Sequence, residues 1–219
     1  YDAVSFDPDN IDGGGELPAS PVPNRISDIH VFDNTYGVYV KNCDDVTIAD
    51  VEAVNNTNTG IYVISSDNIA VTDSTASNIL GSSAQNYGIQ IISSTNSTLL
   101  RNIADDNYDA GINVTGAFNI TVADSIAGNL FSAKRQDYGI RLIASNHTLV
   151  EHNTASNNTL TGIYISGSDN ITVLNNIANN TLGSNVQDYG IQLLSSNDSV
   201  IAWNTVMNNT YTGIYVTGS

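Results

Sequence analysis

The chain has 219 residues, of which 41% are hydrophobic and 13% charged, with 22 acidic against 6 basic side chains. A net charge of −16 is unsuited to binding phosphate, which disfavours nucleic acid and anionic membrane surfaces as partners. No stretch approaches the roughly 18 consecutive apolar residues of a membrane-spanning helix, and a single cysteine, Cys43, excludes an intramolecular disulfide.

The first 25 residues differ from the rest of the chain. They hold all four prolines and the run Gly13-Gly14-Gly15, which predicts an irregular N-terminal arm or a cap on the first repeat. The chain starts at Tyr1 without Met, so we expect a processed or excerpted segment. We therefore expect two parts, an arm or cap over residues 1–25 and a repeat domain over 26–219.

A four-residue motif recurs through the second part. Its glycines are Gly37, Gly60, Gly88, Gly111, Gly139, Gly162, Gly190 and Gly213, spaced alternately by 23 and 28 residues. Each motif reads glycine, apolar, variable, apolar, which is typical of a strand with one buried face. The repeat unit is therefore a pair of coils of 51 residues, and about eight coils are expected.

Each motif is followed by a second alternating run, such as Ile120-Thr121-Val122, and by a third run that ends in a small residue. Asparagine-containing turns then close the coil. Three short strands in a coil this small cannot enclose a core alone, so each coil has to stack on the next. The sequence predicts an all-β, right-handed parallel β-helix (β-solenoid) of alternating 23- and 28-residue repeats. It also predicts amide ladders at the turns and one interior column made of Ile61, Ile89, Ile112, Ile140, Ile163, Ile191 and Ile214.

Every second coil carries five extra residues just before the motif. These loops share the ending Gln-(Asn/Asp)-Tyr-Gly and are expected to form a ridge along one edge. Their tyrosines, Tyr87, Tyr138 and Tyr189, either fold over the corner or form a repeated contact surface. The chain stops at Ser219, before the next expected strand, so we expect an open C-terminal end. Self-association through the solenoid ends or the loop ridge is the expected protein contact.

The pattern Asn-x-x-Gly-Ile-x-Val followed by Asp-Asn-Ile-Thr-Val resembles the right-handed β-helix repeat of NosD-type proteins. It matches best over residues 59–78 and 161–180 and covers residues 28–219. The pattern is also similar to carbohydrate-binding and sugar-hydrolase repeat domains and to surface proteins of methanogenic archaea. The resemblance implies an extracellular or cell-surface location. It also implies a family that includes polysaccharide lyases, epimerases, adhesins and surface-layer components.

The variable position of the motif points outward and forms a column without a carboxylate. Its members are Tyr39, Tyr62, Gln90, Asn113, Arg141, Tyr164, Gln192 and Tyr215. Such a column offers no acid pair for glycoside hydrolysis, but its tyrosines can stack on sugars or on one another. The candidate sugar or partner contacts are Tyr39, Tyr62, Tyr164 and Tyr215, together with the loop tyrosines Tyr87, Tyr138 and Tyr189.

A column on the next face runs through Asp50, Asp73, Arg101, Asp124, His152, Asn175 and Trp203. Arg101, between Asp73 and Asp124, either neutralises stacked acids or forms a lyase-type cluster with them. His147 and His152 are five residues apart, which places them on opposite faces and disfavours a shared metal.

The acidic pairs Asp44-Asp45 and Asp105-Asp106 lie near turns and are candidates for weak Ca²⁺ binding only. We predict no catalytic residue, no cofactor and no dedicated metal site.

Asn-x-Ser/Thr sequons are numerous, and an exported chain is open to glycosylation at the exposed ones. Asn55, Asn157 and Asn208 occupy one equivalent turn and rank first, and Asn96, Asn146 and Asn197 are further candidates.

These features favour a non-catalytic structural or adhesive component of an extracellular or cell-surface layer. In one form of this hypothesis, the protein self-assembles into a polymer. The alternative is a carbohydrate-binding or polysaccharide-processing module, lyase-like or epimerase-like. A periplasmic accessory role in metal maturation is disfavoured by the scarcity of Cys, His and Met.

Overall fold

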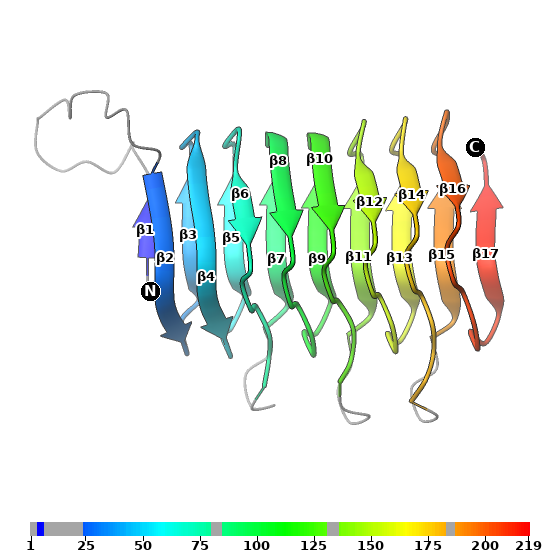
Figure 1. Cartoon of the computed structure of the whole chain (residues 1–219), viewed down its shortest axis with the longest axis horizontal. Coiled ribbons are helices and arrows are strands. Elements are labelled where there is room, and N and C mark those ends of the chain that lie inside the picture. Colours follow the sequence, from blue (N-terminus) through cyan, green and yellow to red (C-terminus); the bar gives the residue numbers. More distant parts are fainter. Residues whose placement is uncertain (1–3, 7–23, 80–84, 131–135, 183–186) are drawn as a thin grey trace, which may run out of the picture.

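The computed structural model describes residues 4–6, 24–79, 85–130, 136–182 and 187–219. Regular structure in this part is entirely parallel β-strand, and the strands follow one another along the long axis of the molecule (Figure 1). No membrane-crossing helix is found in these ranges. Sheet 1 has nine strands: β1 (Val4–Phe6), β3 (Tyr36–Lys41), β5 (Thr59–Ile64), β7 (Tyr87–Ile92), β9 (Ala110–Thr115), β11 (Tyr138–Ile143), β13 (Thr161–Ser166), β15 (Tyr189–Leu194) and β17 (Thr212–Thr217).

Sheet 2 is formed by the second run of each coil. Its eight strands are β2 (Asn24–Phe32), β4 (Val46–Val54), β6 (Ala70–Thr72), β8 (Thr95–Leu100), β10 (Phe118–Ala123), β12 (Leu149–Glu151), β14 (Thr172–Leu174) and β16 (Val200–Ala202). The third run is a ladder of single-residue bridges through Thr75, Ile103, Ile126, Thr154, Ile177 and Thr205. The predicted fold class, a right-handed parallel β-helix, is confirmed.

The core lies between the sheets and is built from columns of identical or similar side chains. Ile140 is in register with Ile112 on one side and Ile163 on the other, as predicted for the isoleucine column. All three are fully buried, and fully buried alanines of the third run pack against the motif glycines, as Ala155 does against Gly139. Stacking at the strand spacing of about 4.8 Å therefore gives one continuous core along the rod.

The glycine that opens each motif is required by close packing. A Cβ on Gly139 would lie 2.6 Å from the carbonyl oxygen of Gly162 and 2.8 Å from the Ala155 Cβ. The motif glycines do not have positive φ, whereas Gly116 and Gly167, in turns after strands of sheet 1, do. Close approach of neighbouring coils, rather than an unusual backbone angle, explains the motif glycine.

A buried ladder of side-chain amides runs along the corner before sheet 1. Its members alternate between asparagine on short coils and glutamine on long coils: Asn56, Gln85, Asn107, Gln136, Asn158, Gln187 and Asn209. The first six are fully buried. We call this set the amide ladder. It gives the glutamine of the loop ending a structural role, because that glutamine takes the place of the asparagine when five residues are inserted.

The N-terminal region differs from the expected irregular segment at β1, which pairs in parallel with β3 through Val4 and Val38. This short strand adds one strand to sheet 1. In sheet 2, β2 begins at Asn24, within the residues 1–25 that the sequence assigns to the arm. The remainder of the proposed arm and the tips of the long loops (80–84, 131–135 and 183–186) lie outside the described residues. The predicted loop ridge therefore stays a prediction.

Candidate functional site

The outward surface of sheet 1 carries two adjacent columns rich in tyrosine, which together we call the tyrosine face. One column is the predicted one, in which Arg141 is in register with Asn113 and Tyr164. The other runs through Tyr36, Thr59, Tyr87, Ala110, Tyr138, Thr161, Tyr189 and Thr212. The loop tyrosines and the motif tyrosines, which the sequence suggests as separate groups, therefore lie on one face.

Near the N-terminal end of this face, three tyrosine rings pack against one another. The ring centroids of Tyr36 and Tyr62 are 5.2 Å apart and nearly parallel, and Tyr39 lies 5.4 Å and 5.3 Å from them. Near the other end, Tyr189 lies 5.7 Å from Tyr215 and 6.0 Å from Tyr211. Both arrangements fit cross-strand aromatic pairing and leave a broad aromatic surface.

Arg141 organises the centre of the tyrosine face. Its guanidinium donates to Asp109 Oδ1 over 2.9 Å, to Asn113 Oδ1 over 2.8 Å and to the Tyr87 hydroxyl over 3.2 Å. The same group lies 5.5 Å and 5.2 Å from the ring centroids of Tyr87 and Tyr138. Only 15% of the Arg141 side chain is exposed. The cation is therefore held as a rigid spacer between two aromatic rings, with its charge paired.

Three phenols of this face have a raised pKa, which favours their neutral, hydrogen-bonding form. Burial is the main cause that raises the pKa of Tyr62, Tyr87 and Tyr138, and Asp109 adds to the effect at Tyr87 and Tyr138. A raised pKa disfavours the phenolate, which is the form that a tyrosine base requires. These three phenols can therefore donate hydrogen bonds and stack, but they are poorly suited to abstract a proton.

Sequence reasoning missed Asp109 as a partner of Arg141. Asp109 stands one residue before β9, outside the alternating strand positions that predict outward side chains. A signal for it exists in the repeat, because the corresponding positions in the long coils are Asn86, Asp137 and Asp188. This column of polar residues borders the tyrosine face.

The structure also places the residues of the second candidate column. Arg101 donates to both carboxylate oxygens of Asp73, over 2.6 Å and 2.7 Å. This bidentate pair holds the pKa of the Asp73 carboxyl below its usual range, chiefly through the hydrogen bond from Arg101. The Asp73 carboxylate is thus paired with Arg101, which fits the interpretation that Arg101 neutralises stacked acids. It does not have the geometry of a free base.

The two histidines and the acidic pairs do not assemble a metal site within the described ranges. No group of three or more His, Cys, Asp or Glu side chains gathers there. Asp44 Oδ1 accepts the Asp67 N–H, and Asp45 Oδ1 accepts the Asn68 amide. Weak Ca²⁺ binding at these turns stays a prediction.

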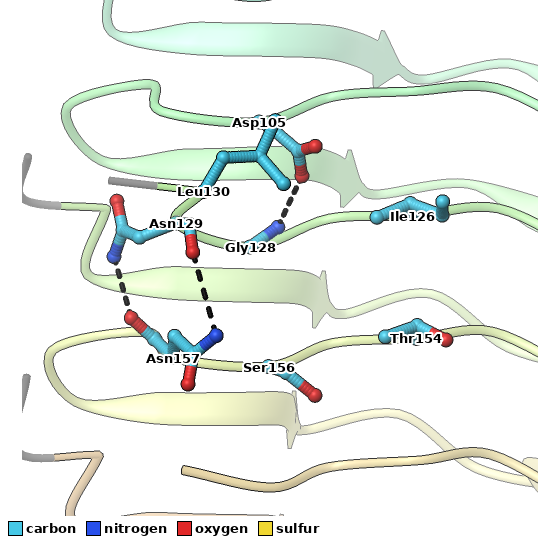
Figure 2. Close-up of a pocket in the computed structure, with 8 residues that line it drawn as sticks. All are labelled: Asp105, Ile126, Gly128, Asn129, Leu130, Thr154, Ser156 and Asn157. Carbon is cyan, nitrogen blue, oxygen red and sulfur yellow. Dashed lines mark hydrogen bonds between the residues drawn. The ribbon is translucent and has the colours of Figure 1, made fainter. Parts of the chain in front are cut away.

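A small cavity of about 70 Å³ lies at the corner that leads into the second long loop (Figure 2). Asp105, 2% exposed, accepts the Gly128 N–H over 2.7 Å. Burial raises the pKa of Asp105 to about 7, with a smaller contribution from Asp106. Beside it, Asn129 and Asn157 exchange hydrogen bonds between side-chain amide and backbone carbonyl. The cavity is a small, partly open corner of the fold that holds one buried carboxyl with a raised pKa.

The sequon asparagines differ in accessibility. Asn55 and Asn157, two of the three ranked first, are buried, and Asn157 Oδ1 accepts the Thr181 N–H over 2.6 Å. Asn96, Asn197 and Asn208 are exposed, and Asn146 is half-buried. Exposure thus ranks these four ahead of Asn55 and Asn157 as glycan acceptors.

Comparison with solved structures finds several that are similar in fold. The periplasmic alginate epimerase AlgG superposes with a TM-score of 0.68 at 19% identity, covering 88% of this chain and 49% of that protein. The Azotobacter vinelandii mannuronan C-5 epimerase AlgE4 A-module gives 0.53 at 14% identity, covering 87% and 57%. PfbA, a surface adhesin of Streptococcus pneumoniae, gives 0.54 at 15% identity, covering 83% and 65%.

This chain spans about half the length of AlgG, and identities this low show the shared fold alone. A search of curated proteins by sequence gave no match. The model of the family described as right handed beta helix region matches residues 19–178 and 126–219, which together span most of the chain. The chain therefore belongs to the right-handed β-helix region family.

Proposed function

We propose that this protein is a non-catalytic adhesive component of an extracellular or cell-surface layer that binds polysaccharide along the tyrosine face. The observation that carries the proposal is that each strand of sheet 1 from β3 to β17, except β9, places a tyrosine on this face, with the amides of Gln90 and Gln192 between them. An aromatic ring offers an apolar face to a sugar, and the phenol and amide groups offer hydrogen bonds at its edge. Strands spaced at about 4.8 Å repeat these groups along the rod, which suits a linear polymer.

The charges of the face favour a neutral polymer over a polyuronate. Arg141 is the cation at its centre, and Asp109 already pairs with it. The chain as a whole carries a net charge of −16, which repels an anionic glycan at low ionic strength. Of the other cations, Lys134 and Arg135 lie outside the described residues, so their contribution requires a variant of its own.

The same charges favour binding without catalysis. Asp109 is tied to Arg141, and the raised pKa of Tyr87 and Tyr138 disfavours a phenolate base. An epimerase-like or lyase-like reaction needs a group that removes a proton from the sugar, and neither Asp109 nor these two phenols is in a suitable state. The epimerase AlgG and the adhesin PfbA share this fold, and this arrangement supports the adhesive alternative.

Affinity electrophoresis of the full chain through gels containing neutral glucan, mannan or xylan, or alginate, tests the proposal. We expect retardation in a neutral gel, and a reduction of about tenfold in affinity for the variant Y62Q/Y138T/Y164Q. These substitutions use residues that occupy the same columns in other coils, namely Gln90, Thr161 and Gln192, so the fold should be retained. A K134A/R135A variant measures the contribution of these two cations, and D124N, altered at an exposed residue after β10, is the control that should bind like the parent.

Unchanged retardation of the folded triple variant would contradict the role of the tyrosine face. Mass spectrometry and NMR can detect unsaturated products or epimerised residues after incubation with each polymer. Either product would contradict the proposal that the protein is non-catalytic. Retardation by alginate alone would leave adhesion intact and overturn the preference for neutral polymers.

Glycans on the protein itself are a separate part of the proposal. Asn96, Asn197 and Asn208 are exposed sequon residues, and an exported chain presents them to a glycosylation system. Peptide mass mapping of the protein from its native source should find added mass on the peptides that hold these three asparagines. Unmodified masses for all three peptides would rule these glycans out.

A further inference from the structure

The turn between sheet 1 and sheet 2 is the most regular of the corners, and two neighbouring coils depart from its rule. Its two outward columns are filled by Asp, Asn or Thr at most positions, as in Asp67-Asn68, Thr95-Asn96 and Asp169-Asn170. The exceptions are Phe118 and His147. Their rings are in contact, with centroids 4.6 Å apart, and Phe118 is 46% exposed. An exposed aromatic pair that replaces hydrogen-bonding residues contributes little to the core, which points to a contact outside the fold.

His147 also occupies a backbone conformation that favours asparagine. Its φ is 55°, in the left-handed region, as are the φ values of Asn119 and Asn170 in the neighbouring coils. A histidine in this region is less favourable than asparagine, whose short amide bonds locally. The structure therefore keeps an aromatic ring where its own repeat prefers an amide.

The exchange of an amide for a ring leaves polar groups available beside it. Elsewhere in this column, the Asn119 amide donates to Asn96 Oδ1 over 2.8 Å and the Asn68 amide donates to Asp45 Oδ1 over 3.1 Å. His147 interrupts this chain of bonds. The Asn170 side chain makes no hydrogen bond within the described part of the protein, nor does the Thr172 hydroxyl.

His147 and Asn170 line a shallow, open groove of about 380 Å³ across β10, β12 and β14, and Phe118 lies beside this groove in contact with His147. The groove is lined by Asn119, His147, Thr148, Leu149, Asn170 and Thr172, and Figure 1 shows the three strands side by side in sheet 2. The lining contains no Asp, Glu, Lys or Arg. It combines one aromatic ring, one aliphatic side chain and several amide and hydroxyl groups, which are the groups that recognise a sugar ring by stacking and by hydrogen bonds to its hydroxyls.

We propose that this groove is a second carbohydrate site, which takes a neutral sugar ring against the Phe118–His147 pair and the Asn170 amide. The groove lies at the N-terminal ends of β10, β12 and β14 in sheet 2. The tyrosine face lies on sheet 1, so the two sites are separate and neither needs the other. A chain with both sites joins two glycan strands, because each site engages its own polymer.

NMR titration of the isotope-labelled full chain, produced in a host without N-glycosylation, tests the site. The probes are hexasaccharides of glucose, mannose, xylose and N-acetylglucosamine, with a glucuronate hexamer as the charged comparison. We expect one neutral probe to shift the His147 ring and the Asn170 side-chain amide. The variant F118T/H147N should weaken that binding by about tenfold, a loss typical of one stacking contact.

This variant restores the residue types of the repeat, Thr95 and Asn170, so it should fold at least as stably as the parent. Y138T/Y164Q, which alters the tyrosine face, should leave the groove shifts unchanged, so failure of one site is distinguished from failure of the other. The proposal is overturned if F118T/H147N binds with parental affinity. It is also overturned if no neutral probe perturbs Asn170, or if the glucuronate hexamer binds there more tightly.

Discussion

The side-chain amide of Gln136 donates to Asn158 Oδ1 over 2.9 Å, joining a 28-residue coil to the 23-residue coil that follows it. In the opposite direction Gln136 Oε1 accepts the backbone N–H of Asn107 over 3.1 Å. Both partners are fully buried. Gln136 therefore satisfies polar groups on two neighbouring coils at once, and these groups have no access to water if it is removed.

We expect Q136A to lower the free energy of unfolding by about 2–5 kcal/mol, because it leaves the Asn107 N–H and the Asn158 carbonyl oxygen buried without partners. Urea unfolding followed by circular dichroism measures the change. N197A, which removes an amide at an exposed position, is the matched control and should lose less than about 1 kcal/mol. Equal losses in the two variants would show that a residue of the amide ladder contributes no more to the free energy of unfolding than an exposed residue does.

The buried carboxyl of Asp105 predicts a pH-dependent stability. Its pKa is about 7 in the folded chain, against an ordinary value of 3.8. The folded state holds the proton between these values and the unfolded state does not, so the free energy of unfolding falls as the pH rises from about 4 to about 7. The fall has an upper bound of about 4 kcal/mol.

Asparagine at this position can still accept the Gly128 N–H and does not ionise. D105N should match the parent near pH 4 and exceed it in stability at pH 8, as measured by urea midpoints at both values. D124N, which removes a charge from an exposed residue, should keep the parental pH dependence. A D105N profile parallel to that of the parent would contradict the assignment.

The packing of the motif glycines predicts intolerance to a single methyl group. G139A places a Cβ within 2.6–2.8 Å of Gly162 O, Ala127 O and Ala155 Cβ, which neighbouring coils cannot relieve without moving apart. We expect a loss of about 2–4 kcal/mol. G167N is the contrasting change, since Gly167 has φ 57°, which asparagine tolerates, and a Cβ there meets nothing within 4 Å. Thermal unfolding should separate the two variants clearly.

His152 is a left-handed residue, with φ 55°, in a column where Asp124 and Asn175 precede and follow it. H152N should raise the free energy of unfolding by about 0.5–1 kcal/mol by relieving an unfavourable backbone conformation. The same urea assay measures it. A loss of stability would mean that the His152 side chain makes a contribution larger than its backbone cost.

The Asp109–Arg141 pair controls the charge of the tyrosine face. D109N leaves a hydrogen-bonding oxygen for Arg141 but removes the charge that neutralises it. We expect the variant to be retarded roughly threefold more than the parent in alginate gels at low ionic strength, with the difference lost at 1 M salt. The neutral gels should not distinguish the two proteins. An unchanged mobility in alginate would show that pairing is not what limits binding of uronates.

The sequence predicts the fold in unusual detail because every repeated position has a physical reason that a pattern can express. The alternating motif predicts sheet 1, and the register of Ile112, Ile140 and Ile163 follows from counting glycines. The third run was harder to define, since it forms single-residue bridges at Thr75, Ile103 and their equivalents rather than a continuous strand.

The candidate site was predicted only in part. The outward column of Tyr39, Tyr62 and Arg141 follows from strand alternation, and the structure confirms its register. The pairing of Arg141 with Asp109 does not follow from strand alternation. Asp109 precedes its strand, so the direction of its side chain depends on the turn. Burial of Asn55 and Asn157 also escaped the sequence, because a sequon looks the same in a ladder and on a surface. The closer resemblance to NosD-type and archaeal surface proteins stays a prediction.

The alternation of asparagine and glutamine in the amide ladder has a consequence for how such a protein can change in length. Removing one coil would bring two asparagines or two glutamines together, where the ladder uses one long and one short amide. Removing or duplicating 51 residues keeps every Asn–Gln contact. Genetic rearrangement that preserves the fold should therefore proceed in pairs of coils, so the molecule lengthens in steps of about 9.6 Å.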